Sequence, residues 1–322
     1  MFLDGLLAVI QVYIIGIVFS LLEIWRDFWK RKAGGLDEEV ILKNAKNGKF
    51  LKEKKSKVAV ITGGDGNIGK EIIKIFLKLD FTVCSVGLHN LFNCENVKFF
   101  KTDLFDLDEV EATSKKIKNE FPGGIDVVVC NGGVMLVPFK LSKNSHECHF
   151  EVNVFSHIFL IKELKSILKE KENRILFISS STSRASNFSK NDVIDRNFWK
   201  KYLNGYKTYA DSKMLMNIFV DQVDKNEFPM TMFVASHPGV VPGPLYRHTN
   251  KLFRFIINKI MKYFIRDSHT AGLRLVELIF RDDLISGAYY EDGIDVSHVT
   301  EAVPPKLRKK LYEKMTHEIQ GY

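Results

Sequence analysis

The chain has 322 residues, of which 45% are hydrophobic and 27% are charged. This length and balance suit one large folded domain with appendages and exclude an intrinsically disordered chain. The four cysteines form no CxxC pair and have no interleaved histidines, so we expect neither a metal site nor a disulfide scaffold. Most of the net charge of +8 lies between Arg26 and Lys57, which hold 11 basic and 5 acidic side chains. The near-neutral remainder argues against a nucleic-acid-binding surface.

The amino-terminal segment is predicted to be a transmembrane anchor. Residues 5–22 carry no charge, and a helix of this length covers about 27 Å, enough to cross a bilayer core. Asp4 is the only charged side chain before the run and no small-residue cleavage site follows, which disfavours a signal peptide. The length of the run disfavours a buried core helix. Side chains typical of a cytosolic interface come next, namely Trp25, Arg26, Trp29, Lys30, Arg31 and Lys32. We expect an anchor over 1–25 and the rest of the chain in the cytosol.

Residues 26–56 are lysine-rich and are expected to form a tether, either near an anionic membrane surface or as a solvated linker. Beyond it, short apolar runs alternate with amphipathic helices, as in a parallel sheet covered on both faces. The expected strands are 57–62, 81–86, 97–101, 125–130, 174–179, 231–236 and 286–290. The expected helices are 68–79, 106–120, 144–171, 207–224 and 268–280. The predicted fold is therefore α/β, a Rossmann-type doubly wound parallel sheet of about seven strands over 57–295, with a C-terminal tail over 296–322.

Two motifs carry chemistry. Residues 62–69 (TGGDGNIG) join the first strand to the first helix, where glycines let the backbone approach a pyrophosphate at the helix amino terminus. In the segment YADSK, Tyr209 and Lys213 are four residues apart, so on a helix both reach one ligand. A tyrosine acting as an acid–base near neutral pH needs a neighbouring cation, which Lys213 supplies. Each motif alone also fits an ordinary loop or amphipathic helix.

Further polar residues follow in a consistent order. The serines at 179–181 end an apolar strand, at the sheet edge where a hydroxyl can bond a substrate carbonyl. The glycines at 132 and 133 end the preceding strand, where they let a ring or ribose come close. Asn153 lies in an apolar helical stretch, where such a residue is usually a structural hydrogen-bonding partner.

In this order, the motifs resemble the classical short-chain dehydrogenase/reductase family over roughly residues 57–295. The matching segments are TGGDGNIG, Asp103 in TDL, CNGG at 130–133, Asn153, the serine strand, YADSK and HPG at 237–239. The runs GVMLVP at 133–138 and HPGVV…LYRH at 237–248 are most similar to the branch with the X-chromosomal and retinol-dehydrogenase-like members.

The resemblance implies roles for the matching residues. Tyr209 would exchange the proton at the substrate oxygen, and Lys213 would bind the nicotinamide ribose and lower the pKa of Tyr209. Ser180 would hold the carbonyl, and Asn153 would position a water that relays protons. The residues implied in cofactor binding are Gly63, Asn67, Ile68, Gly69, Asp103, Asn131, Gly132, Tyr209, Lys213, Pro238 and Gly239.

The chain departs from the family pattern in four places. Asn67 replaces the usual second glycine, a change that the tolerance of asparagine for a left-handed backbone would accommodate. The usual NNAG has become CNGG, and Gly243 stands where a threonine is expected. The link between the second and third strands is too short for a full crossover helix. The second strand ends in Gly87-Leu88-His89, without an acid or an arginine, which favours NADP(H) over NAD(H) and leaves dual use open.

Residues 251–266 are apolar and basic, and they lie where the family builds its substrate lid, near 240–268. They would close over a lipid and touch the membrane, or else pack on the core. The sequence therefore predicts a membrane-anchored NAD(P)-dependent oxidoreductase that interconverts a lipophilic alcohol and its carbonyl, a retinoid, steroid, polyprenoid or fatty aldehyde. It would lie on the endoplasmic reticulum or a lipid droplet, with a homo-oligomer left open. The alternative is a catalytically degenerate, membrane-tethered binding or scaffold protein with the same fold.

Overall fold

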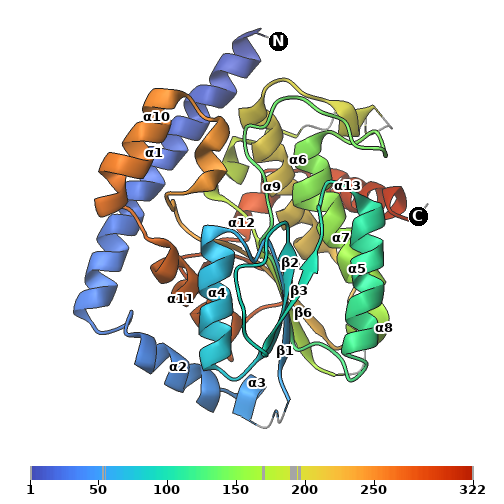
Figure 1. Cartoon of the computed structure of the whole chain (residues 1–322). Coiled ribbons are helices and arrows are strands. Elements are labelled where there is room, and N and C mark those ends of the chain that lie inside the picture. The colour runs from blue at the N-terminus through green and yellow to red at the C-terminus, as the bar shows by residue number, and fades with distance from the viewer. Residues whose placement is uncertain are drawn as a thin grey trace.

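A parallel sheet lies at the centre of the computed structural model, which describes residues 2–52, 54, 56–168, 171–188, 194 and 197–320 (Figure 1). Its eight strands follow the order β3-β2-β1-β4-β5-β6-β7-β8, and only β8 runs antiparallel to its neighbour among the described strands. The strands are β1 (Val58–Thr62), β2 (Thr82–Gly87), β3 (Val97–Lys101), β4 (Val127–Cys130), β5 (Asn173–Ile178), β6 (Thr231–His237), β7 (Tyr289–Glu291) and β8 (Ile294–Asp295). The Rossmann-type prediction is confirmed. The sequence missed β8 because two residues are too short to show an alternating pattern.

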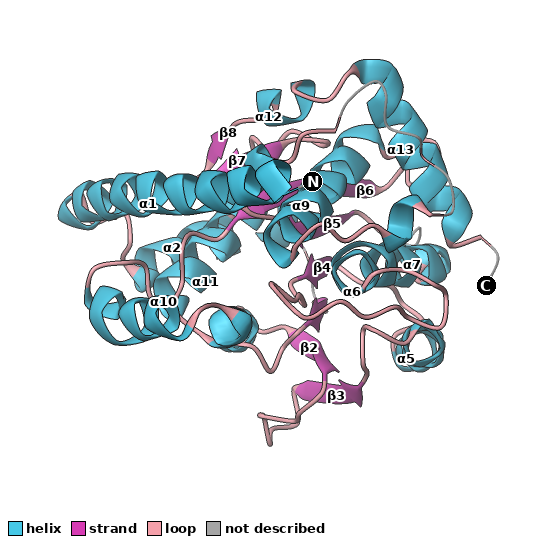
Figure 2. Cartoon of the chain, turned by 90° about the horizontal axis from the view of Figure 1, so that it is seen from above, coloured by secondary structure: helices cyan, strands magenta, loops and turns pink. Residues whose placement is uncertain are grey.

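Two hydrophobic cores flank the sheet because successive strand residues point to opposite faces. In β1, Val60 belongs to one core, while Ala59 and Ile61 belong to the other. Figure 2 shows helices on both sides of the strands. The first core is covered by α5 (Leu107–Glu120), α6 (Cys148–Phe150), η1 (Glu151–Phe155), α7 (Ser156–Glu163), α8 (Lys165–Leu168), α9 (Gly205–Gln222), α12 (His298–Glu301) and α13 (Pro305–Glu318). The second is covered by α2 (Glu38–Asn47), α3 (Lys49–Lys52), α4 (Asn67–Lys78) and α11 (Ser268–Ile279).

Both predicted appendages of the domain contain packed helices. In the stretch expected to be a tether, Ile41 of α2 and Phe50 of α3 are buried in the second core. In the stretch expected to be a tail, Leu311 and Met315 of α13 are buried in the first core. The folded domain therefore includes helices from the stretches predicted as tether and tail. The sequence did not indicate this packing because the many lysines of these helices hid a short apolar stripe. Residues 53, 55, 321 and 322 of these stretches lie outside the described chain.

The longest helix is α1 (Phe2–Lys32), which carries the apolar run. Among the described helices it alone is long and apolar enough to be a candidate membrane span. It lies along one side of the domain, beside the helical segment after β6 (Figure 1). That segment comprises η4 (Pro244–His248), α10 (Lys251–Phe255), η5 (Ile256–Ile260) and η6 (Met261–Tyr263). Two further helical turns, η2 (Ser181–Ala185) and η3 (Phe198–Lys200), lie earlier in the chain.

Candidate active site

A cavity of about 1040 Å³ opens at the carboxyl ends of the strands, where open α/β sheets bind ligands. All of the residues predicted to bind cofactor or substrate line it, except Gly69 and Asn153. One end is walled by the loops after β1, β2 and β3. The other end is walled by apolar side chains of α1 and of residues 251–261, including Val12, Ile17, Phe253, Ile256 and Ile257. The cavity therefore joins a polar crevice to an apolar chamber.

The predicted proton-transfer group is assembled in this cavity. Asn204 caps the amino terminus of α9 through a bond from the Lys207 N–H, and the helix then places Tyr209 and Lys213 one turn apart. The Tyr209 hydroxyl lies close enough to Ser180, which follows β5, for the serine to favour the phenolate, and both residues line the cavity. Ser180 Oγ also accepts from the Thr182 hydroxyl at 2.8 Å, so its orientation is fixed by its own turn. Phenol and serine hydroxyl thus meet at one point of the cavity.

Burial perturbs both titratable groups of this helix. Lys213 Nζ lies 5.8 Å from the centre of the Tyr209 ring and donates to the Ile178 carbonyl at 2.8 Å. Desolvation raises the pKa of Tyr209 to about 12, because burial disfavours the phenolate. Desolvation also lowers the pKa of Lys213 to about 7, because burial disfavours the ammonium. Strongly shifted pKa values on two neighbouring groups in a cavity are typical of functional sites.

Asn153 holds the cavity wall from behind. It lies in η1, a π-helical turn of the kind that is frequent at functional sites. Its side-chain oxygen accepts from the Val134 N–H at 2.8 Å, and its amide donates to the Val134 carbonyl and to Ser212. An added Cβ on Gly133 would lie 3.2 Å from that oxygen and 3.8 Å from Lys213 Nζ, so the amide and the ammonium face the same spot.

Sequence reasoning missed His157, which is buried behind this wall and contacts both Asn153 and Thr62. His157 Nδ1 lies 3.0 Å from the Asn153 carbonyl oxygen, and His157 Nε2 lies 2.9 Å from the Thr62 hydroxyl. Burial lowers the pKa of His157 to about 4, so the ring is neutral. A neutral ring satisfies both contacts if Nδ1 donates and Nε2 accepts. The spacing from Asn153 to His157, one helical turn, was the available signal.

The loop after β1 fits a dinucleotide pyrophosphate. Gly63 has φ +61°, and an added Cβ there would lie 2.7 Å from the Gly132 Cα, so only glycine suits this turn. Gly66 caps α4 without any side-chain bond, which leaves the first-turn N–H groups of a twelve-residue helix open to an anion. Ile68 lies in this first turn, and an added Cβ on Gly69 would lie 2.2 Å from the Gly63 oxygen.

Asn67 does not adopt the left-handed backbone conformation that the sequence analysis considered for it. It is the first residue of α4, outside the non-glycine residues with positive φ. Its side-chain amide instead donates to the Pro242 carbonyl at 3.3 Å. An added Cβ on Gly243 would lie 2.7 Å from that amide nitrogen, so the glycine that replaces the expected threonine makes room for Asn67. The two departures from the family pattern are in contact with each other.

Asn131 and Gly132 mainly brace this loop. The Asn131 side chain donates to the Thr62 and Gly63 carbonyls, both at 3.0 Å. The backbone N–H groups of Asn131 and Gly132 donate to the Thr62 hydroxyl at 2.9 and 3.0 Å. Both residues line the cavity, but these bonds occupy their polar groups with the loop itself.

The end of the cavity where the sequence predicts the adenosine is formed without a crossover helix. Residues 88–96, between β2 and β3, contain no described helix, and Leu88 and Leu91 are half exposed. Asp103 is exposed at the cavity edge, where its carboxylate accepts from the Phe105 N–H. Asp65 was not singled out by the sequence. Its carboxylate accepts from the N–H groups of Leu88 and His89 at 3.0 and 3.1 Å, and lies 2.5 Å from where a Cβ on Gly87 would be.

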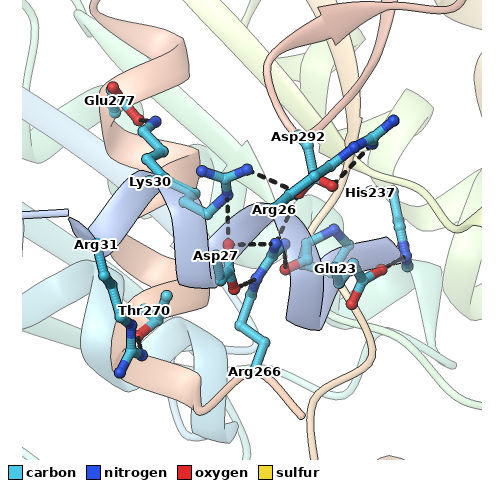
Figure 3. A network of polar contacts seen from close by, with 12 residues as sticks. Glu23, Arg26, Asp27, Lys30, Arg31, His237, Arg266, Thr270, Glu277 and Asp292 are labelled. Atoms are coloured by element: carbon cyan, nitrogen blue, oxygen red, sulfur yellow. Dashed lines mark hydrogen bonds and ion pairs between the residues drawn. The ribbon is translucent and has the colours of Figure 1, made fainter. Parts of the chain in front are cut away.

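The loop after β6 is clamped from α1 (Figure 3). Glu23, 1% exposed, lies 2.9 Å from His237 Nε2 and accepts from the Val240 N–H at 2.8 Å. Arg266 donates to the Pro238 carbonyl at 3.1 Å, and Arg266 makes a bidentate ion pair with Asp27 of α1. Gly239, at φ +97°, lies between the two, since an added Cβ there would be 2.6 Å from Arg266 and 2.9 Å from Glu23. The predicted Pro238 and Gly239 are thus held between α1 and Arg266.

Comparison with known proteins gives one consistent family. A family model described as short chain dehydrogenase matches residues 57–191. Polyprenol dehydrogenase of Danio rerio is 28% identical, covering 82% of this chain and 87% of its own. Polyprenol dehydrogenase of Mus musculus is 23% identical, covering 96% of this chain and 93% of its own. Retinol dehydrogenase 14 of the same species is 24% identical, covering 66% of this chain and 64% of its own.

Solved structures agree on the fold. A short chain dehydrogenase family protein from Francisella tularensis superposes with a TM-score of 0.56, 20% identity and coverage of 73% and 96%. An NADPH-bound carbonyl reductase from chicken fatty liver superposes with a TM-score of 0.55 and 14% identity, covering 74% of this chain and 97% of its own. These identities are low, so the likeness concerns the architecture.

Proposed function

Because the chain belongs to the classical short-chain dehydrogenase/reductases, in the retinol-dehydrogenase-like branch, we propose that it interconverts a lipophilic alcohol and its aldehyde or ketone at a membrane. As a member of this family it is an NAD(P)-dependent oxidoreductase acting on alcohols or carbonyls. The observation that carries the proposed substrate class is the continuity of the cavity, which runs from Tyr209 and Ser180 into an apolar chamber between α1 and α10.

The proposed chemistry rests on four side chains. When bound, the nicotinamide supplies or accepts the hydride at the substrate carbon. Ser180 donates a hydrogen bond to the substrate oxygen, and the Tyr209 hydroxyl gives that oxygen its proton in reduction or takes it back in oxidation. The ammonium form of Lys213 stabilises the phenolate that Tyr209 becomes after giving its proton. Asn153 fixes the cavity wall beside Lys213. There it positions the water through which Tyr209 regains its proton from solvent.

The apolar chamber supports a long, flexible lipid. A volume of about 1040 Å³ lies at the upper end of the usual range for ligand pockets, and its lining includes both the glycine loop and the apolar side chains of α1 and α10. Among retinoid, steroid, polyprenoid and fatty aldehyde substrates, the two polyprenol dehydrogenases that cover most of their own length favour the polyprenoid. We place the enzyme on the endoplasmic reticulum or a lipid droplet, with its active site facing the cytosol.

The test is turnover of a polyprenal by the full-length chain in detergent or vesicles. Tyr209→Phe keeps the ring and removes the proton, so we expect turnover to fall by at least about a hundredfold. Binding of the reduced cofactor, followed by nicotinamide fluorescence, should be nearly unchanged in the same variant. If the variant turned over like the parent, Tyr209 would not be the proton donor. If a folded parent bound neither NADH nor NADPH, the scaffold alternative would replace the enzyme.

For the cofactor, we propose that Asp65 favours NAD(H) and replaces the sequence-based preference for NADP(H). That preference rested on the missing acid at residues 87–89. The Asp65 carboxylate, supplied by the glycine loop, lies where an acidic side chain on Gly87 would begin. A carboxylate there accepts from a ribose diol and repels a 2′-phosphate. Lys140, which also lines the cavity, could attract a 2′-phosphate, but its ammonium lies 4.3 Å from the centre of the Phe105 ring.

The matching experiment compares Kd for NADH and NADPH in the parent and in Asp65→Asn. The parent should bind NADH more tightly. The amide preserves the shape and removes the charge, so the ratio of the two Kd values should shift towards NADPH by roughly tenfold, about 1.4 kcal/mol. A parent that bound NADPH more tightly would restore the sequence-based preference.

A further inference from the structure

A stripe of small and polar residues faces the domain along almost all of α1. The stripe recurs every three or four residues, and its members are Gly5, Ala8, Val12, Gly16, Ser20, Glu23 and Asp27. All are buried except Gly16, which is partly exposed and lines the cavity. This spacing places them on one face of a helix. A helix meant only to be surrounded by lipid needs no such face.

Polar contacts hold this stripe at both ends. At the amino-terminal end, the Gly5 carbonyl accepts from Asn204, the N-cap of α9, at 2.9 Å, and the hydroxyls of Tyr13 and Tyr206 lie 2.9 Å apart. At the other end, Glu23 and Asp27 are buried in the network of His237, Arg266 and Asp292 (Figure 3). The network is dense enough to hold the pKa of Asp292 well below its usual range, despite burial, mainly through Arg266 and Arg274.

These contacts are incompatible with a helix that crosses a bilayer. From Gly5 to Asp27 the helix measures about 33 Å, roughly the thickness of a hydrocarbon core. Asn204 caps α9 and Tyr206 belongs to it, and this helix packs on the central sheet and carries Tyr209. If residues 5–22 crossed the membrane, α9 would have to enter the hydrocarbon or give up both contacts.

The outer face of α1 is apolar and exposed in the part of the chain that the structure describes. It exposes eleven large hydrophobic side chains, from Leu6 to Trp29, of which Ile17, Leu21 and Trp25 are each more than 60% exposed. The neighbouring segment 251–264 exposes Leu252, Phe255, Ile260, Tyr263 and Phe264. That segment contains four basic residues, Lys251, Arg254, Lys259 and Lys262, and no acidic one. The Tyr13 and Phe253 rings, with centres 5.0 Å apart, join the two surfaces.

We propose that α1 stays docked when the protein binds a membrane, and that these two surfaces, the lipid face, lie in the cytosolic leaflet of an anionic phospholipid bilayer without crossing it. The apolar residues enter the acyl region, and the four basic side chains contact the lipid phosphates. The apolar chamber lies directly beneath this face, between Gly16 of α1 and Phe253 of α10. A lipid alcohol therefore passes from the leaflet into the chamber without entering water. This inference rests on the proposed membrane association and not on the proposed chemistry.

The experiment is a topology measurement on the full chain, with an N-glycosylation acceptor tag placed before Met1 and synthesis in the presence of microsomal membranes. The docked arrangement predicts a chain that sediments with the membranes and keeps an unmodified tag. A glycosylated tag would show that α1 crosses and would overturn the proposal. A chain left in the soluble fraction would overturn it as well.

A crosslinking measurement tests docking directly. Gly5→Cys with Asn204→Cys, in a background of Cys94→Ser, should be joined by a short thiol crosslinker on membranes, because an added Cβ on Gly5 lies 3.1 Å from the Asn204 amide. The control pair, Ile14→Cys with Asn204→Cys, places one thiol on the exposed face and should give at least tenfold less product. Equal yields would refute docking. Cofactor fluorescence on the same samples separates the two proposals, because loss of cofactor binding with intact crosslinking refutes only the enzyme.

Discussion

Glu23 links α1 to the loop after β6 that lines the cavity, and removing its carboxylate should impair catalysis. In Glu23→Ala, the Val240 N–H and His237 lose their acceptor in a site that is 1% exposed. A hydrogen bond to a charged partner contributes roughly 1.5 to 3 kcal/mol. If the two losses overlap rather than add, the penalty is roughly 3 kcal/mol, or about a hundredfold in kcat/KM at 1.4 kcal/mol per decade.

The assay measures kcat/KM for polyprenal reduction together with Kd for the cofactor and the free energy of unfolding. Glu23 is a positioning residue, so its loss should raise the Kd of the cofactor and lower kcat of the folded enzyme. Glu23→Gln retains one acceptor oxygen and should recover about tenfold of the loss. Glu277→Ala is the matched control. It removes the α11 partner of Lys30, which lies on α1 like Glu23, at a partly exposed site where an ion pair is worth under about 1 kcal/mol.

One pattern would refute this argument. If Glu23→Ala lowered only the free energy of unfolding, and the folded fraction kept the kcat and cofactor Kd of the parent, then α1 would stabilise the domain without positioning the loop. A drop of equal size in Glu277→Ala would lead to the same conclusion.

Two further predictions concern the cavity. Lys213 is neutral in the folded protein above its pKa of about 7, whereas the unfolded chain keeps that proton up to about pH 10.5. The unfolded state therefore binds more protons in this window, and the free energy of unfolding should rise by roughly 1 to 2 kcal/mol from pH 7 to 8.5 in the cofactor-free protein. Lys213→Met should lose this rise in denaturant titrations, and an unchanged slope would contradict it. Gly16→Trp should fill the chamber, since no atom lies within 4 Å of an added Cβ. It should raise KM for a long polyprenal at least tenfold and leave a short aldehyde nearly unaffected, while Ile14→Trp on the outer face changes neither.

The architecture followed from the sequence because its signals are local. Each buried strand is a short β-branched run between turn residues, and the glycine loop sits directly between β1 and α4. The absence of a helix between β2 and β3 could also be foreseen, since chain length alone limits what fits there. Tyr209, Ser180 and Lys213 converge as expected because an α-helix and a parallel sheet fix their relative positions.

What the sequence concealed was contact between distant segments. The Asp65 carboxylate lies at the end of β2, 2.5 Å from where a Cβ on Gly87 would be, although the two residues are 22 positions apart in the chain. Asn67 was judged by its backbone tolerance, whereas its side chain bonds across the cavity to Pro242. Glu23 and Asp27 were overlooked because the apolar run and the basic residues after it dominate that region. Two acids four residues apart, directly after the apolar run, were the signal that α1 has protein partners.

The open link between β2 and β3 has a consequence for how the binding energy of the cofactor is distributed. In a fold with a full crossover, a helix supports the adenosine half, but here residues 88–96 leave that half against half-exposed leucines and an exposed Asp103. The well-built contacts lie at the pyrophosphate turn and at the clamped loop after β6. A mononucleotide that keeps the nicotinamide, ribose and phosphate should therefore retain an unusually large share of the affinity. We therefore expect recognition of the cofactor, apart from the choice between NAD(H) and NADP(H) proposed for Asp65, to be concentrated at the end of the molecule that reacts.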